Sequence, residues 1–448
     1  MTDEGNKIKA GGFWQSITFK IMIIGLIILM LLIPLIMIYS LIQERETYLE
    51  EAKQDIVSGW AGTQTISGPV IALPYRQVLI NDKQVIESKK IAYFLPDELH
   101  ITGEINPEIR YRGIYKTVVY SSDLQINGYF AIPKLDGLHI KASDVLWNEA
   151  YTMIGITDMR GIQNQVSFHW NDSDQTVNPG LPTDEIIQSG FNSGIEFTKQ
   201  DQNMFSFQLN LNGSENLNFI PLGEKTTVNL KSGWGNPGFE GAFLPDQRTV
   251  NSKGFTASWE IFSLNRNFPQ QWIGNNYNIE GSAFGVRLIM PVDHYTKITR
   301  SVKYAIMFIA LTFMVFFFFE VTNKYRIHPV QYLLVGLALC IFYILLLSLS
   351  EHVGYNVAYL IAGIGIITMV TGYSHSVFKK TNKSVILGII LVVLYLFLFT
   401  LIQLQDYSLL MGSIGLFVAM AIIMYISRNI DWYRPVGKEG PGDKRLGF

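Results

Sequence analysis

The side chains with the most evident chemical potential are ionisable residues at the ends of apolar segments. Glu351 and His352 follow one such segment, and Asp406 lies in a later short turn. Carboxylate and imidazole groups can ligate a cation or activate water. The three residues could therefore bind a cation or form the active site of a membrane-embedded hydrolase. They could also face the underside of an extramembrane domain. Solvated helix ends give the same pattern, and we expect that simpler role.

A second carboxylate, Glu320, lies four residues before Lys324 at the end of another apolar segment. This spacing favours an ion pair on one helix face. Because an ionisable residue at membrane depth is commonly functional, a proton or ion relay is the alternative. Arg428 and Asp431, three residues apart, are expected to pair in the same way. No charge lies in the central third of any apolar segment, which argues against a secondary transporter.

Motifs of the common enzyme classes are missing from the sequence. The seven histidines never fall four residues apart, and there is no Gly-x-Ser-x-Gly elbow and no phosphate loop. The single cysteine, Cys340, excludes a disulfide and a zinc site built on cysteines. We therefore predict a non-enzymatic protein with no catalytic residue, no cofactor and no metal.

The elements that hold these residues are six long apolar segments. A hydrocarbon core about 30 Å thick requires about 20 apolar residues in a helix. The predicted spans are residues 21–42, 302–322, 329–350, 355–374, 385–404 and 407–426. The first is longer than a signal-peptide core and has no small-residue cleavage site, so we interpret it as an uncleaved signal anchor. The sequence predicts a multi-pass protein of the lipid bilayer.

The short loops indicate how the chain is oriented. Lys and Arg collect before the first span, in alternate turns and after the last span, so both tails, residues 1–20 and 427–448, are expected in the cytoplasm. The segment 43–301 then lies outside. Residues 44–300 carry a net charge of −8 and the remainder +6. An acidic large domain argues against nucleic acid as a partner.

The external segment has the pattern of β structure. Phe205–Leu211 alternates apolar and polar residues, and Asn-Gly and Asp-Gly turns recur. We expect a β-rich sandwich rather than a barrel, with Gln43–Ile56 continuing the first span as helix. If the domain has two lobes, Asn171–Gly194 is the best joint. Trp234, Trp259 and Trp272 could line a carbohydrate or peptide groove, but we expect them to pack between sheets.

Several segments resemble the CreD family of bacterial inner-membrane proteins. In the membrane part they are residues 300–313 with Phe319-Glu320, 328–337, 347–352 and 428–433; in the external part they are 67–74, 158–161 and 243–245. No match is found in 171–194 or beyond Tyr433.

The resemblance implies an inner-membrane protein with a periplasmic domain, linked to cell-envelope integrity, envelope stress, β-lactam response and colicin tolerance. It supplies no catalytic residue. The expected partners are lipid and a periplasmic or envelope protein, and no oligomeric state is predicted. A permease-like subunit is the alternative, although such permeases usually have three later spans rather than five. The candidate functional residues are Glu320, His328, Glu351, His352, Arg428, Asp431, Asp158 and Arg160.

Overall fold

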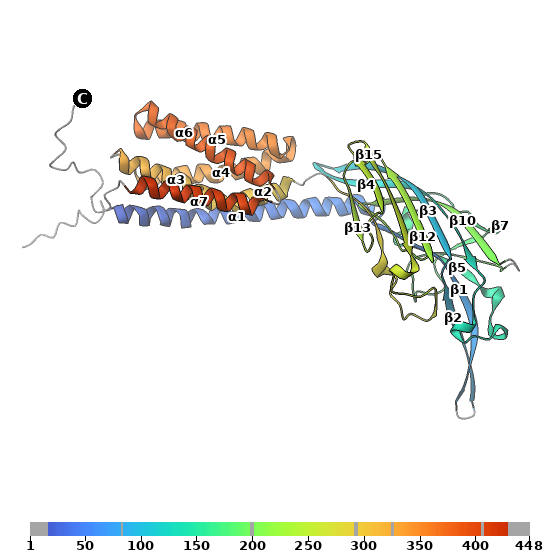
Figure 1. The fold of residues 1–448 in the computed structure, drawn as a ribbon. Coiled ribbons are helices and arrows are strands. Elements are labelled where there is room, and N and C mark those ends of the chain that lie inside the picture. Colours follow the sequence, from blue (N-terminus) through green and yellow to red (C-terminus); the bar gives the residue numbers. More distant parts are fainter. Residues whose placement is uncertain are drawn as a thin grey trace, which may run out of the picture. The chain divides into compact units, whose positions relative to one another are not determined.

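The computed structural model describes residues 17–81, 84–197, 201–290, 294–323, 327–404 and 407–428. They form two units (Figure 1). The helical unit comprises Met1–Tyr48 together with Val292–Phe448, and the β unit comprises Leu49–Pro291.

The helical unit contains one long helix from the start of the chain and a group of helices from its last third. They are α1 (Ile17–Ser58), α2 (His294–Lys303), α3 (Ala305–Thr322), α4 (Pro329–Val353), α5 (Tyr355–Phe378), α6 (Thr381–Gln403) and α7 (Ser408–Ser427). All except the short α2 are long and apolar enough to cross a membrane, which gives six candidate spans in the described residues. The predicted arrangement of one early and five late spans is confirmed.

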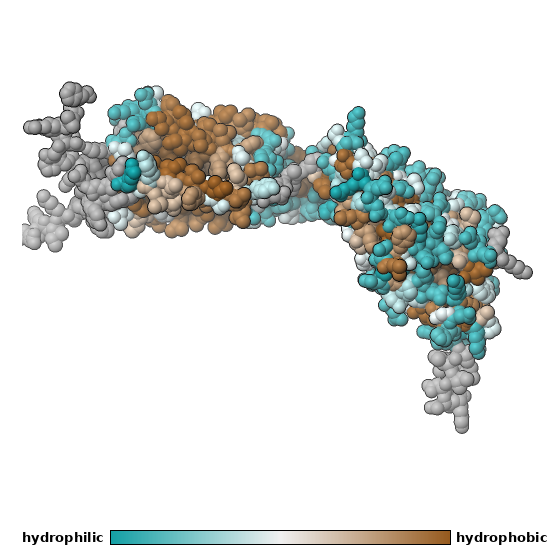
Figure 2. All heavy atoms as spheres, in the orientation of Figure 1, coloured by the Kyte–Doolittle hydropathy of each residue, from teal (hydrophilic) through white to brown (hydrophobic). Residues whose placement is uncertain are grey.

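Apolar side chains on the outside of the helical unit suit contact with lipid (Figure 2). In α1, the buried residues Ile27, Leu31, Leu35 and Ile38 repeat every three or four positions and form one stripe, whereas the residues between them are exposed or half-buried. A Cβ on Gly336 of α4 would lie 2.2 Å from a methyl carbon of Leu31. Glycine therefore lets α1 and α4 approach closely, as small residues do between membrane helices.

Two helices differ from the others, α1 in its length and α7 in its burial. α1 has 42 residues, about 63 Å of helix, so it is about twice as long as a hydrocarbon core is thick. Its predicted continuation beyond the first span is confirmed, and its segment from Leu49 belongs to the β unit. α7 differs from the other helices in its burial, because only 6% of its most apolar stretch is buried inside the protein.

The β unit consists of two sheets. The first has the order β13-β17-β11-β1-β5-β9-β8, with β2 also on β1 and β16 on β2. Its strands are β1 (Gln64–Asn81), β2 (Gln84–Phe94), β5 (Tyr151–Ile156), β8 (Val177–Pro179), β9 (Gly190–Gly194), β11 (Asn216–Phe219), β13 (Pro237–Gly241), β16 (Gln271–Ile273) and β17 (Phe284–Leu288). The second has the order β14-β15-β12-β3-β4-β10-β6-β7. Its strands are β3 (Glu98–Arg112), β4 (Tyr115–Ala131), β6 (Phe168–Trp170), β7 (Ser173–Gln175), β10 (Gln202–Ser214), β12 (Lys225–Ser232), β14 (Gln247–Asn251) and β15 (Gly254–Phe262).

One apolar core connects the two sheets, which confirms the sandwich. In β10, exposed and buried residues alternate over most of the strand, as the sequence pattern predicted. Trp259 is 2% exposed and Trp272 is 4% exposed, so both tryptophans pack in the core as expected. Trp234 is only partly buried and packs against the edge of that core.

The hypothesis of a joint at Asn171–Gly194 is wrong. This segment contains β7 of the second sheet and β8 and β9 of the first, so the chain crosses the sandwich there. Buried residues on both sides of it, such as Trp170 and Ile195, belong to the same core. Short strands with few apolar residues have the composition of a loop, which explains the error.

Candidate functional site

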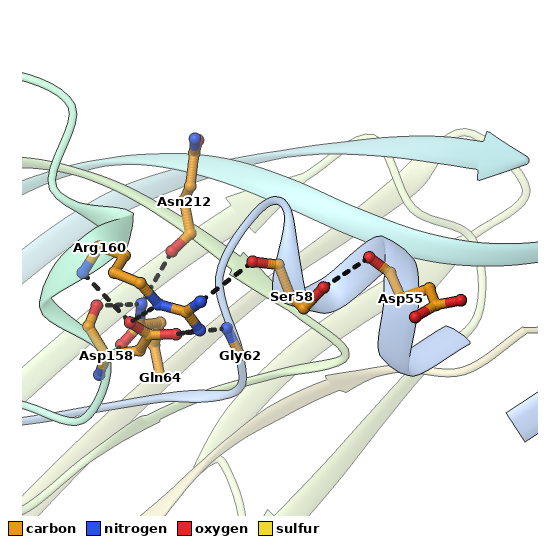
Figure 3. Close-up of polar contacts among 7 residues, drawn as sticks. All are labelled: Asp55, Ser58, Gly62, Gln64, Asp158, Arg160 and Asn212. Carbon is orange, nitrogen blue, oxygen red and sulfur yellow. Dashed lines mark hydrogen bonds and ion pairs between the residues drawn. The ribbon is translucent and has the colours of Figure 1, made fainter. Parts of the chain in front are cut away.

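Asp158 and Arg160 lie where β5 ends and a short 3-10 helix, η5 (Met159–Gly161), begins. Asp158 caps η5, because its Oδ1 accepts a hydrogen bond from the Arg160 backbone N–H at 3.1 Å. The Arg160 guanidinium also binds the carboxylate with two nitrogens, Nε to Oδ1 at 2.9 Å and Nη2 to Oδ2 at 2.6 Å (Figure 3). This bidentate geometry fixes both side chains.

The pair also holds the end of α1 within the β unit. Arg160 Nη1 donates to the Ser58 carbonyl at 3.0 Å, and Asp158 Oδ2 accepts from the Gly62 N–H at 2.9 Å. The last carbonyls of a helix have no partner inside the helix. Arg160 supplies one for Ser58, so the pair attaches the helix end to the sandwich.

Gln64 on β1 completes this cluster, which we call the Asp158 clamp. Its side chain is fully buried, and its Nε2 donates to the carbonyls of Asp158 and Asn212 at 2.9 Å each (Figure 3). A Cβ on Gly161 would lie 2.5 Å from that nitrogen, so only glycine fits there. The clamp therefore joins β1 and β5 of the first sheet to β10 of the second. Gln64 could not be recognised from the sequence, because its partners are distant along the chain.

The environment of Asp158 favours its ionised form. The hydrogen bond from Arg160 lowers the pKa of Asp158 to about 2, the Gly62 and Arg160 backbone N–H groups act in the same direction, and partial burial opposes them. Both carboxylate oxygens are engaged by donors of the chain. An ionised and fully engaged carboxylate acts as a structural anchor rather than as a general acid.

Replacing Asp158 with asparagine should loosen the clamp at neutral pH and have less effect in acid. Because the folded-state pKa is depressed, the stabilisation is present above about pH 4 and is lost as the pH falls towards 2. We expect a loss of about 1–2 kcal/mol at pH 7, seen as faster hydrogen exchange at Gly62. The exposed Asp172→Asn is the control. Equal exchange at Gly62 in wild type and Asp158→Asn at pH 7 would contradict this assignment.

Glu320 on α3 is fully buried and lies at a junction of three helices. Its carboxylate forms an ion pair with Lys20 of α1. Oε1 also accepts from the Ile327 N–H at 2.9 Å, and Oε2 accepts from the Tyr332 hydroxyl of α4 at 3.0 Å. The predicted partner Lys324 lies outside the described residues. Lys20 could not be found from spacing, because it is 300 positions away.

Glu351, at the end of α4, is held by residues of two other helices. Its Oε1 accepts from the Tyr295 hydroxyl of α2 at 2.8 Å and lies 4.0 Å from Arg45 Nε of α1. His352 is exposed, and its Nδ1 lies 3.2 Å from the Ser348 carbonyl of its own helix. The two candidates therefore have separate partners. Asp406, the third residue of the proposed cation site, lies outside the described residues.

The remaining candidates are placed at helix ends. His328 caps α4, where its Nδ1 accepts from the Val330 N–H at 3.3 Å. The Arg428 guanidinium lies 4.2 Å from the ring centre of Tyr425, a cation–π distance. Its predicted partner Asp431 lies outside the described residues. Among the residues that the structure describes, no group of three or more His, Cys, Asp or Glu side chains could hold a metal ion.

Comparisons with known proteins agree with this architecture. The family model described as "Inner membrane protein CreD" matches residues 16–433. The chain is 36% identical over 416 residues to the inner membrane protein CreD of Escherichia coli (strain K12), and the match covers 91% of each chain. The chain therefore belongs to the CreD family of multi-pass inner-membrane proteins.

Proposed function

We propose that this chain is a non-enzymatic inner-membrane protein that supports cell-envelope integrity and the response to envelope stress, including colicin tolerance and β-lactam response. In this proposal, both termini are cytoplasmic, and the β unit is periplasmic and binds an envelope component or partner protein. The observation that carries it is the β unit itself. It is a two-sheet domain with its own core, inserted in the chain between the first and second candidate spans.

The contacts of the candidate residues support a structural rather than a catalytic role. Asp158 is saturated by Arg160 and Gly62, and Glu320 by Lys20, Ile327 and Tyr332. Glu351 is held by Tyr295. Groups that act as a general base or a metal ligand need access to a substrate or an ion. Carboxylates engaged in this way hold elements together.

The decisive experiment replaces Glu351 and His352, two of the residues on which the hydrolase alternative depends. We expect Glu351→Gln/His352→Ala to restore colicin tolerance and β-lactam resistance to a deletion strain as well as wild type does. Glutamine keeps an acceptor for Tyr295, so folding is preserved. Membrane insertion is checked by labelling a cysteine at Asn276 with a thiol reagent that cannot cross the membrane. Loss of complementation by a normally inserted variant would refute the non-enzymatic role.

A further inference from the structure

A row of uncharged polar side chains crosses the outer face of the second sheet. Strand register places one such residue on each of six adjacent strands, and each neighbours the next. The row consists of Gln247 on β14, Ser258 on β15, Asn229 on β12, Thr102 on β3, Gln125 on β4 and Gln208 on β10. All six are amides or hydroxyls, and none is buried.

A second row, two residues from the first on each strand, carries charges on β12, β3 and β4, and each of these charges has a partner. Lys231 Nζ lies 2.9 Å from Glu104 Oε2, and Asp123 Oδ1 accepts from Gln208 at 2.8 Å. At the edge, the Arg248 guanidinium lies 5.8 Å from the ring centre of Phe239. These contacts satisfy the charges near the uncharged row, so a strongly ionic ligand would have to break them.

The two rows line a groove of about 530 Å³. Five strands contribute to its walls and floor, from β14 to β4. Neighbouring strands lie about 4.8 Å apart, so the five members of the uncharged row that line the groove present a polar group at that interval over about 20 Å. A groove of this volume accommodates a small oligomer rather than a single small solute.

The polar groups of the groove are free to bind a ligand. In the described part of the chain, the side chains of Thr102, Gln125, Asn229, Gln247 and Ser258 make no hydrogen bond with another group of the protein. Amides and hydroxyls offer donors and acceptors without charge. No aliphatic or aromatic side chain belongs to the row, so an apolar ligand gains little there. The matching ligand is neutral, hydroxyl-rich and extended.

We propose that this groove binds a neutral oligosaccharide, lying across the strands along the uncharged row. The inference rests on the proposed function, because it names the class of envelope component that the β unit binds. An extended peptide is the competing ligand, since it would instead pair with the free edge of β14, whose five residues are all exposed.

The test uses the full-length chain in lipid nanodiscs with two neutral probes, a tetramer of N-acetylglucosamine and maltotetraose. Binding is measured by calorimetry and by saturation-transfer NMR. We expect at least one probe to bind, and Gln125→Ala/Asn229→Ala to weaken it about tenfold or more. The matched control is Gln188→Ala/Asn276→Ala, which removes the same residue types at exposed positions outside the groove. Near-ultraviolet circular dichroism verifies that both variants are folded.

Three results would overturn the assignment: no binding of either probe, equal weakening by the control pair, or binding of an extended peptide that β14 variants abolish. Complementation separates this failure from failure of the proposed function. If neither sugar binds while wild type still restores envelope function, the oligosaccharide assignment is wrong and the envelope role stands.

Discussion

Replacing Glu320 with alanine is expected to destabilise the helical unit by about 3–5 kcal/mol, because it leaves Lys20 without its carboxylate inside the bundle. It also removes the acceptor of the Ile327 N–H and of the Tyr332 hydroxyl. The measurement is thermal unfolding of the full chain in detergent. Glu44→Ala, at an exposed carboxylate of α1, should change stability by less than about 0.5 kcal/mol.

Two further variants separate anchoring from a proton relay. Lys20→Met/Glu320→Leu removes both charges and should recover most of the stability lost in Glu320→Ala, since an apolar pair can replace a buried ion pair. Glu320→Gln retains the shape of the side chain, but its amide cannot take up and release a proton as a carboxylate does. Across all three variants, we expect envelope function to be lost only where the stability of the helical unit is lost. A stable Glu320→Gln chain without envelope function would establish the relay and refute the anchor.

In the β unit, we expect the largest single effect from Arg266→Ala. Arg266 is 7% exposed, and its guanidinium donates to the carbonyls of Phe268 at 2.6 Å and Leu222 at 3.1 Å and to the side chain of Gln270. Burial lowers the pKa of Arg266 to about 10, so it remains charged at neutral pH. Alanine leaves several buried carbonyls without a donor, at a cost of about 3–5 kcal/mol.

The measurement is proteolysis of the β unit in the full chain at increasing urea concentrations. Arg266→Lys should lie between wild type and alanine, because an ammonium cannot reproduce the planar fork of the guanidinium. Arg287→Ala is the control, since Arg287 is half-exposed and its nitrogen lies 3.9 Å from Glu215. If Arg266→Ala unfolds at the same urea concentration as Arg287→Ala, the carbonyls are satisfied in another way and the assignment is wrong.

The features that the sequence revealed are those with a local physical cause. A membrane span is recognised by its length and composition, because the bilayer acts on each helix separately. Strand alternation in β10 is equally local, since one face of the strand is buried and the other is not. These signals were sufficient for the six candidate spans and the sandwich.

The contacts that the sequence did not reveal join distant parts of the chain. The pair of Lys20 with Glu320 joins two helices, so the local spacing that predicts Lys324 gives no sign of it. Gln64 and Arg266 gave no signal, because a buried polar residue is recognised only when its partners are known. The parallel pairings of β1 with β11 and of β3 with β12 are of the same kind. The uncharged row across the second sheet became visible only with their register.

The slight burial of α7 indicates which interaction holds this helix in the membrane. With 6% of its apolar window inside the protein, α7 shares little surface with the bundle, although Gly415 packs against Phe397 of α6. Partition into hydrocarbon therefore retains it, with little contribution from helix association. A polypeptide truncated after Leu404 should therefore retain the packing of its remaining spans, because α7 buries so little of its apolar surface against them.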